Sequence, residues 1–377
     1  MDKLKVGIMG GGGIVGAHVQ GYDRVKELCE VAAVAEPNAA RHETIRKWFG
    51  DKVRIVPDYH ELLGLKEIQA VDICLPHSLH LPATAAAAEA GKHVLVEKVM
   101  ARNVWECDRM IEACDKHGVS LSVCHDRHLN SNWVALKEIV ASGALGEIFL
   151  LKLDHNQNVA VPPGHWIANF DEVGGGAIMS CLTHQLDALR WYGGEPEAVN
   201  CMCKIIPERM EGEFLGLMSA RMKSGALAQL SINWWTRPNS SKDGLWYEMV
   251  QICGTKGEAY YMSGRGSFVK IHDKDEDFVE VCNTPHDGHA NLVGEWVKGL
   301  LGMTARAVPD GRSARGAVEL AEAAYLAAAA KAEVKFPVVP TPWADRSDPA
   351  MVARQFARNA PQTVKEKINP ANPLAAK

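Results

Sequence analysis

The stretch LKVGIMGGGGIVGAH, Leu4–His18, decides the fold of the first part of the chain. An apolar run typical of a buried strand leads into four glycines, and a helical pattern follows them. Gly11, Gly13 and Gly16 have the G-x-G-x-x-G spacing. Glycines at this place let the backbone turn tightly and approach a pyrophosphate, whose charge meets the free N–H groups of a helix N-terminus. The stretch predicts a dinucleotide-binding turn, in which Ile14 and Val15 also take part.

Short β-rich runs alternate with helical patterns over the first 125 residues or so. The expected strands are Leu4 to Met9, Val31 to Ala35, Val53 to Val56, Val71 to Leu75, His93 to Val96 and Val119 to Cys124. Runs of this kind, apolar on both faces, are typical of a parallel doubly wound sheet. The expected fold class is therefore α/β, with an N-terminal Rossmann domain over residues 1–127.

Glu36 ends the second expected strand, twenty residues after Gly16. A carboxylate at this place can accept hydrogen bonds from the hydroxyls of the adenosine ribose, and it repels a 2′-phosphate. We therefore expect NAD as the cofactor and NADP as the less favoured alternative, for which Arg41 leaves some room.

The pattern changes after a helix expected over Asn130 to Ala141. Period-2 runs are typical of a large, mostly antiparallel open sheet with one wetter face. The expected strands are Phe214 to Met222, Ala226 to Trp234, Tyr247 to Cys253, Ser267 to His272 and Phe278 to Cys282. Helices are expected over His289 to Leu301 and Ser313 to Ala332. We predict an α+β domain for substrate binding and oligomerisation over 128–340, whose late helix is able to pack back on the first domain, and a C-terminal arm over 341–377.

Composition excludes several classes of protein. The 377 residues carry 41 Lys and Arg against 46 Asp and Glu, a formal charge of −5, and no dense basic run for nucleic acid. No apolar stretch reaches the roughly 20 residues that span a bilayer, and no signal peptide is visible. The ten cysteines form no Cys-x-x-Cys pair. We expect a cytoplasmic protein without a metal site, the cluster of Cys74, His77 and His80 included.

Polar residues follow three consecutive expected strands. Pro76, His77 and His80 follow the fourth, Glu97 and Lys98 the fifth, and His125 to His128 the sixth. Ligands of an open parallel sheet bind outside the carboxyl ends of its strands. We therefore expect Pro76, His77, His80, Glu97 and Lys98 to line the cofactor crevice, although each histidine could equally be a structural residue of a turn.

A second glycine run, Gly174 to Gly176, begins a helix that carries Ser180, His184 and Asp187. At α-helical spacing these three residues share one face. A histidine so placed suits deprotonation of an alcohol, and the alternative is a structural histidine held by Asp187.

Together these motifs resemble the Gfo/Idh/MocA family, typified by glucose-fructose oxidoreductase and inositol 2-dehydrogenase, over residues 4 to 340. The resemblance implies exchange of a hydride between a nicotinamide cofactor and a sugar, a sugar derivative or a cyclitol. It also implies homodimers or homotetramers formed through the C-terminal sheet. Lys98 matches the lysine of the family's Glu-Lys-Pro motif, and His184 matches its catalytic histidine.

Two positions depart from the family pattern: Val99 replaces a proline, and Ser180 replaces a common aspartate. The family's substrate loop resembles residues 165 to 176. We expect the pocket to contain Arg127, His155, His165, Trp166 and Asn169, with Ser180 and Asp187 as possible proton relays.

Three alternatives remain open. The altered triad is compatible with an aromatic dihydrodiol dehydrogenase or with an enzyme that uses transient oxidation to cleave a glycosidic bond. The third is a catalytically silent protein that senses a nucleotide, because a fold does not determine function.

Overall fold

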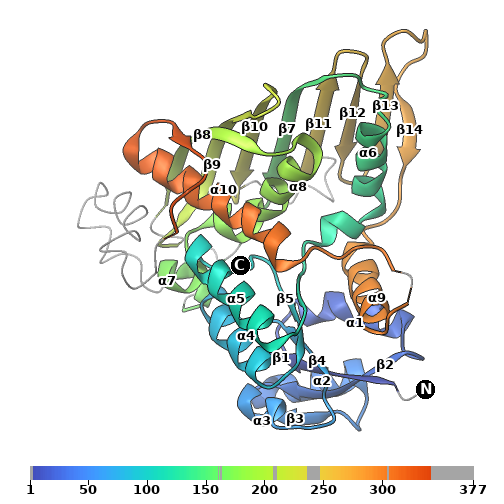
Figure 1. Ribbon diagram of the computed structural model, residues 1–377, viewed down its shortest axis with the longest axis vertical. Coiled ribbons are helices and arrows are strands. Elements are labelled where there is room, and N and C mark those ends of the chain that lie inside the picture. The colour runs from blue at the N-terminus through green and yellow to red at the C-terminus, as the bar shows by residue number, and fades with distance from the viewer. Residues whose placement is uncertain are drawn as a thin grey trace. The chain divides into compact units, whose positions relative to one another are not determined.

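The computed structural model describes residues 3–159, 161, 164–206, 210–235, 247–303 and 305–340, which form two compact units. The first unit comprises Met1–Ala101, Glu106–Asn130 and His286–Arg315. The second comprises Arg102–Trp105, Ser131–Pro285 and the chain from Gly316. Each unit is built on one sheet (Figure 1). The expected arm over 341–377 lies outside the described residues.

The first unit contains a six-stranded parallel sheet in the order β3-β2-β1-β4-β5-β6. Its strands are β1 (Leu4–Met9), β2 (Cys29–Ala35), β3 (Arg54–Val56), β4 (Ala70–Ile73), β5 (His93–Val96) and β6 (Leu121–Val123). The order reverses between β1 and β4, as in a doubly wound dinucleotide-binding domain. The predicted fold class of this part is confirmed.

Helices connect the strands of the first sheet. They are α1 (Val15–Arg24), α2 (His42–Phe49), α3 (Tyr59–Leu63), α4 (His80–Glu89) and α5 (Val104–His117), with 3-10 turns at Ala39–Arg41, His77–Leu79 and Asp126–Leu129. None of the helices in the described ranges is long and apolar enough to cross a membrane.

Helix α9 (Gly288–Leu300) belongs to the first unit although it lies late in the sequence. Its apolar side chains join the core beneath α1, where Val293 and Trp296 are buried with Val15 and Tyr22. The two helices approach closely at Gly21 of α1, because a Cβ atom there would lie 2.5 Å from the Cβ of Val293.

The second unit contains a nine-stranded sheet in the order β14-β13-β12-β11-β7-β10-β9-β8-β15. Its strands are β7 (Ile148–Asn156), β8 (Pro196–Ile205), β9 (Glu213–Met222), β10 (Leu227–Asn233), β11 (Glu248–Gly254), β12 (Gly257–Met262), β13 (Gly266–Ile271), β14 (Val279–Cys282) and β15 (Val334–Lys335). All pairs are antiparallel except β7 with β10. The mostly antiparallel sheet is confirmed, and β7, β8, β12 and β15 were not predicted.

The helices of the second unit are α6 (Ser131–Ala141), α7 (Phe170–Val173), α8 (Thr183–Gly193) and α10 (Gly311–Ala330), which starts in the first unit; a 3-10 turn lies at Trp166–Ala168 and a π-turn at Ile178–Leu182. Helices α6 and α8 pack on the sheet (Figure 1). The expected wetter face is present, since Arg221 and Gln229 are exposed while Met218 and Leu230 are buried.

The close contact of α1 with α9 predicts a contrast between two glycines of this helix pair. Gly21→Ala should lower the free energy of unfolding by about 1–3 kcal/mol, because the new methyl group would overlap Val293 and the carbonyl oxygen of Ala290. Gly294→Ala in α9 is the matched control, because its nearest atom, a methyl carbon of Val25, lies 3.6 Å away. That control should be neutral or stabilising by up to about 1 kcal/mol. Urea unfolding of the three proteins tests this, and equal losses in both variants would contradict it.

Candidate active site

The glycine-rich turn after β1 is packed against neighbouring atoms at its start and is open to solvent at its tip. Gly10 has a φ of 93°, and a Cβ atom there would lie 2.4 Å from the carbonyl oxygen of Cys74. A Cβ atom on Gly12 or Gly13 would meet no heavy atom within 4 Å, and Ile14 is 36% exposed. The tip of the turn is therefore open, as a turn that approaches a pyrophosphate must be.

A side chain is excluded most clearly at Gly10, one position before the predicted spacing begins. Gly11 is also crowded, since a Cβ atom there would lie 2.7 Å from Ile45 Cδ1 and 3.0 Å from Glu36 Oε2. Gly16 lies in α1, and a Cβ atom there would only touch Trp48 at 3.4 Å. Val15 is fully buried at the first position of this helix. The geometry thus requires glycine at Gly10, not at Gly16.

Glu36 follows β2 and holds the glycine turn. One carboxylate oxygen accepts a hydrogen bond from the Gly11 N–H at 2.7 Å, and the other accepts from the Asn38 N–H at 2.8 Å. The carboxylate is thus fixed beside the open turn by backbone donors. This is the position that the sequence predicted for binding a ribose.

His80 is fully buried at the start of α4. Its ring nitrogens lie 2.9 Å from the carbonyl oxygens of Val99 and Leu75. Both ring nitrogens thus contact backbone carbonyl oxygens, so His80 links the turns that follow β4 and β5. The expected cofactor contact of His80 stays a prediction. Pro76 and the buried His77 lie at the 3-10 turn before α4.

Glu97 and Lys98 follow β5. The Glu97 carboxylate is buried and accepts hydrogen bonds from His18 Nε2 at 2.9 Å and from the Lys98 N–H at 3.1 Å. Burial alone would raise the pKa of Glu97, but the hydrogen bond and charge of His18 lower it to about 2. Lys98 is half-buried, and the Lys98–Val99 peptide bond is cis. Glu97 is therefore an ionised structural group beside Lys98, and its expected contact with the cofactor stays a prediction.

Arg127 follows β6 in the first unit and is almost fully buried. Its Nη1 lies 2.5 Å from Asp126 Oδ2 and 2.7 Å from His286 Nε2. These contacts hold Arg127 against the segment that leads into α9. Its expected role toward the substrate stays a prediction.

In the second unit, the run Gly174 to Gly176 makes a turn with no room for any side chain at Gly175 and Gly176. A Cβ atom on Gly175 would lie 2.2 Å from the hydroxyl oxygen of Tyr325, and one on Gly176 would lie 2.2 Å from the carbonyl oxygen of Glu213. The turn leads directly into the segment that carries Ser180, His184 and Asp187, all of them buried.

Tyr325 and Glu213 hold the start of this segment, and sequence reasoning missed both. The Tyr325 hydroxyl accepts hydrogen bonds from the Gly176 and Met179 N–H groups at 3.0 and 3.2 Å, and Glu213 accepts from the Ile178 N–H at 2.7 Å. Burial raises the pKa of Glu213 to about 7. No local signal could have found the pair, because the two residues lie on distant strands and helices.

The expected single helix is a π-turn followed by α8. Ser180 lies in the π-turn over Ile178–Leu182, and His184 and Asp187 lie in α8. The α-helical spacing used to predict a shared face therefore applies to His184 and Asp187 alone. Single π-turns inside helices often occur at functional sites.

His155 lies one residue before the end of β7 and is buried in a polar group on the α8 side of the sheet. Its ring packs on Tyr247 with centroids 4.7 Å apart, and its Nδ1 lies 3.6 Å from Glu248 Oε1. The same Glu248 oxygen accepts a hydrogen bond from Gln185 of α8 at 3.0 Å. Glu248 and Gln185 are buried polar residues that sequence reasoning did not single out.

The expected substrate loop is more exposed. His165 and Asn169 are exposed and flank the half-buried Trp166. The Asn169 side chain accepts a hydrogen bond from the Glu172 N–H at 3.0 Å and so caps α7. The rings of His165 and Trp166 are tilted by 30° with centroids 5.8 Å apart. These residues are accessible, and their contact with a substrate stays a prediction.

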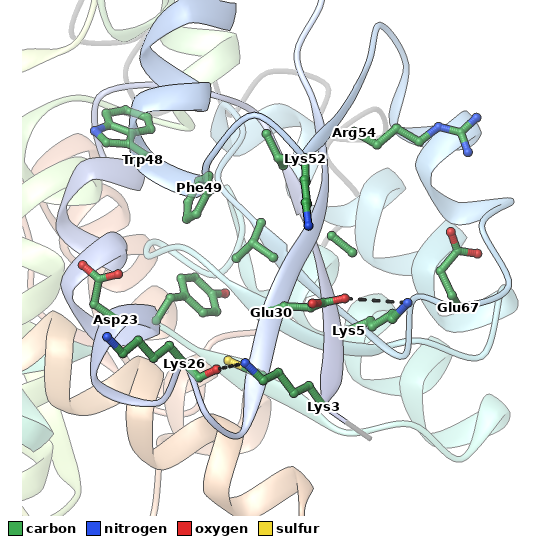
Figure 2. Close-up of a pocket in the computed structure, with 15 residues that line it drawn as sticks. Lys3, Lys5, Asp23, Lys26, Glu30, Trp48, Phe49, Lys52, Arg54 and Glu67 are labelled. Carbon is green, nitrogen blue, oxygen red and sulfur yellow. Dashed lines mark hydrogen bonds and ion pairs between the residues drawn. The ribbon is translucent and has the colours of Figure 1, made fainter. Parts of the chain in front are cut away.

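A hollow of about 580 Å³ lies elsewhere on the first unit (Figure 2). Its walls carry Lys3, Lys5, Lys26, Lys52 and Arg54, together with Trp48 and Phe49. It lies at the amino ends of β1, β2 and β3, whereas the glycine turn follows the carboxyl end of β1. It contains none of the predicted site residues.

The raised pKa of Glu213 predicts a pH dependence of stability. The native state keeps a proton on Glu213 up to about pH 7, while the unfolded chain loses it near the ordinary pKa of 4.5. The free energy of unfolding should therefore fall as the pH rises between these values. Glu213→Gln removes this loss, so it should stabilise the protein by about 2–3 kcal/mol at pH 8 and by almost nothing near pH 4.5.

Urea unfolding at both pH values measures this difference. The exposed Glu197 of β8 supplies the control, because Glu197→Gln removes the same charge from the surface. Equal effects of Glu213→Gln at the two pH values would contradict the assignment.

Two family descriptions match the chain. Residues 4–125 match "Oxidoreductase family, NAD-binding Rossmann fold", and residues 133–260 match "GFO/IDH/MocA C-terminal domain". The first match covers all six strands of the parallel sheet, and the second covers the nine-stranded sheet from β7 into β12.

Proteins with similar sequences or structures include dehydrogenases of sugars and cyclitols. Myo-inositol 2-dehydrogenase of Thermotoga maritima is 26% identical over 280 residues, which are 73% of this chain and 80% of that protein. The NADP-dependent scyllo-inositol 2-dehydrogenase IolW of Bacillus subtilis is 24% identical over 76% of this chain and 74% of its own length. A solved levoglucosan dehydrogenase, in complex with NADH and levoglucosan, shares the fold with a TM-score of 0.81 at 22% identity, covering 89% of this chain and all of that one. The chain therefore belongs to the Gfo/Idh/MocA family of sugar and cyclitol oxidoreductases, and it carries the family's NAD-binding Rossmann fold at residues 4–125.

Proposed function

We propose that the protein is an NAD-dependent dehydrogenase that oxidises a secondary alcohol of a sugar, a sugar derivative or a cyclitol. The observation that carries the proposal is the Glu36 carboxylate, which backbone N–H groups hold beside an open glycine turn. Gly10 to Ile14 would hold the pyrophosphate, and Glu36 would hold the ribose. When bound, NAD supplies the acceptor for the hydride of the alcohol carbon.

The chain's own residues supply the proton chemistry of this proposal. His184 takes the proton of the reacting hydroxyl, and Lys98 stabilises the negative charge that develops on its oxygen. Ser180 and Asp187 relay the proton or orient His184. Arg127, His155, Trp166 and Asn169 contact the substrate.

A panel of sugars, inositols and sugar acids tests the reaction. Reduction of NAD by at least one of them, with a keto product, supports the proposal. If NAD binds measurably and no member of the panel reduces it, the proposal is wrong.

Cofactor preference should depend on Glu36. Glu36→Ser should weaken the binding of NAD and relieve the repulsion of a 2′-phosphate, shifting the preference toward NADP by about 1–3 kcal/mol. Because the carboxylate also accepts the Gly11 and Asn38 N–H groups, Glu36→Gln is the matched variant that keeps an acceptor without the charge. Fluorescence titration with NADH and NADPH measures the shift. Equal affinities of the wild-type protein for both cofactors would overturn this assignment of Glu36.

Turnover should depend on Lys98 and His184. Lys98→Ala and His184→Ala should each lower kcat by roughly 10²–10⁴-fold, with little change in the affinity for NAD. The double variant should be hardly slower than the slower single variant, because two residues that act on one proton are strongly non-additive. Steady-state rates and NADH titrations of the three variants provide the measurement.

Ser180→Asp tests the departure from the usual triad. If Ser180 or a water relays the proton, restoring the carboxylate should keep or raise kcat. Loss of activity in Ser180→Asp together with a neutral His184→Ala would show that the proton leaves by another route.

We also propose a cytoplasmic location for the protein. For the nine-stranded sheet, we infer that the partner is a second copy of the chain. Apolar side chains stand on the face of β8, β9 and β10 opposite the buried one: Met202 is 71%, Leu217 44% and Leu227 53% exposed. Met202 and Leu217 are cross-strand neighbours. Light scattering should give the mass of a dimer or tetramer, and Leu217→Lys should lower it. A monomeric wild-type protein would contradict the inference.

A further inference from the structure

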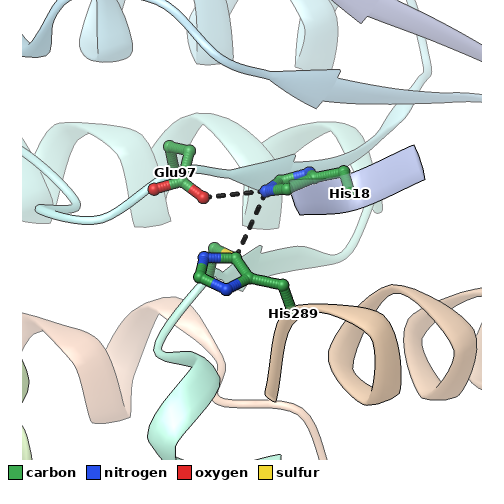
Figure 3. A group of neighbouring side chains, drawn as sticks. His18, Glu97 and His289 are labelled. Atoms are coloured by element: carbon green, nitrogen blue, oxygen red, sulfur yellow. Dashed lines mark hydrogen bonds and ion pairs between the residues drawn. The ribbon is translucent and has the colours of Figure 1, made fainter. Parts of the chain in front are cut away.

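Four side chains with metal-ligating atoms meet inside the first unit (Figure 3). They are His18 of α1, Glu97 after β5, Cys124 after β6 and His289 of α9. One ligand atom from each lies within 4.8 Å of every other. Two imidazoles, a thiol and a carboxylate form a ligand set that zinc accepts in proteins.

In both histidines, the Nδ1 atom lies next to a carboxylate oxygen outside the group of four ligands. Nδ1 of His18 lies 2.8 Å from Asp72 Oδ2, and Nδ1 of His289 lies 3.3 Å from Asp126 Oδ2. A carboxylate on one ring nitrogen is the arrangement that orients histidines whose other nitrogen binds a metal. For both residues, this leaves Nε2 as the ligand atom.

The positions of the two Nε2 atoms are consistent with a metal ion bound inside the cluster. Nε2 of His289 is buried and has no hydrogen-bond partner among the described residues. Nε2 of His18 lies 2.9 Å from Glu97 Oε1 and 3.7 Å from Cys124 Sγ. Around a tetrahedral zinc ion, nitrogen and sulfur ligands are about 3.5 Å apart, and nitrogen and oxygen ligands about 3.3 Å. These two separations are within about half an ångström of the tetrahedral values, and all four ligand atoms lie within 4.8 Å of one another. Side-chain movements on the order of an ångström would therefore bring all four into reach of one ion.

We propose that His18, Glu97, Cys124 and His289 bind one zinc ion. Four protein ligands leave no open position, so the site is structural. The ion replaces two protons, one between His18 and Glu97 and one on the Cys124 thiol, and both leave to solvent. It joins the helix α9, which returns late in the sequence, to α1 and to the ends of β5 and β6. This role is independent of the proposed dehydrogenase reaction.

Metal analysis of the purified full-length chain tests the site. After dialysis against zinc and then against metal-free buffer, the wild-type protein should retain about one zinc ion per chain, and Cys124→Ser and His289→Ala should each lose it. Cys107→Ser is the matched control, because Cys107 is equally buried in the first unit and lies outside the cluster. It should keep the zinc.

Cobalt substitution tests the same site without relying on a variant that folds. Cobalt(II) added to the metal-free wild-type protein should produce the absorption of tetrahedral cobalt and a thiolate-to-cobalt band, which zinc should abolish. The proposal is overturned if the folded wild-type chain retains no zinc, if cobalt gives no thiolate band, or if folded Cys124→Ser retains as much zinc as Cys107→Ser. In those cases the cluster is an ion network held by protons alone.

Discussion

Burial of three carboxylates at one edge of the parallel sheet is the constraint on which the first unit depends. Asp72, Glu97 and Asp126 lie in β4, after β5 and after β6, and all are almost fully buried. An ionised carboxylate in such surroundings is costly unless a cation and hydrogen-bond donors accompany it. His18 and Tyr22 of α1 supply donors to Asp72, and His18 also faces Glu97. The side chains on the inner face of α1 therefore meet two requirements: they pair with the buried carboxylates and they pack in the apolar core.

The same requirement explains why the chain returns to the first unit after residue 285. Asp126 is paired with Arg127, and His286 and His289 lie 3.0 and 3.3 Å from it. The two histidines come from the segment that leads into and begins α9, whose Val293 and Trp296 then close the core beneath α1. Electrostatic pairing and apolar burial thus select the same late segment. Sequence order alone cannot assign this segment to a unit, because its partners are more than a hundred residues away.

The predictable part of the fold is the part specified by short-range patterns. The strands Leu4–Met9 and His93–Val96 were predicted with their observed bounds, because each is an apolar run that ends at a turn. The strands Ile148–Asn156 and Pro196–Ile205 were missed. The first mixes an apolar run with a late alternation, and the second begins with proline and is interrupted by polar residues. Their pairing comes from neighbouring strands, which no local pattern contains.

The candidate site also has one part that the local sequence predicts and one part that depends on distant residues. Glu36 and the glycine turn are separated by one strand, helix and turn, so their spacing could be read from the sequence. At the start of the segment that carries His184, the sequence shows only three glycines, and the reason for them lies in distant residues. Tyr325 and Glu213 occupy the space that side chains at Gly175 and Gly176 would need, and their oxygens accept the N–H groups that the turn leaves open. Excluded volume and hydrogen bonding therefore impose one backbone path on this turn. A glycine run in a sequence marks where such a path is needed, but only the fold identifies the groups that require it.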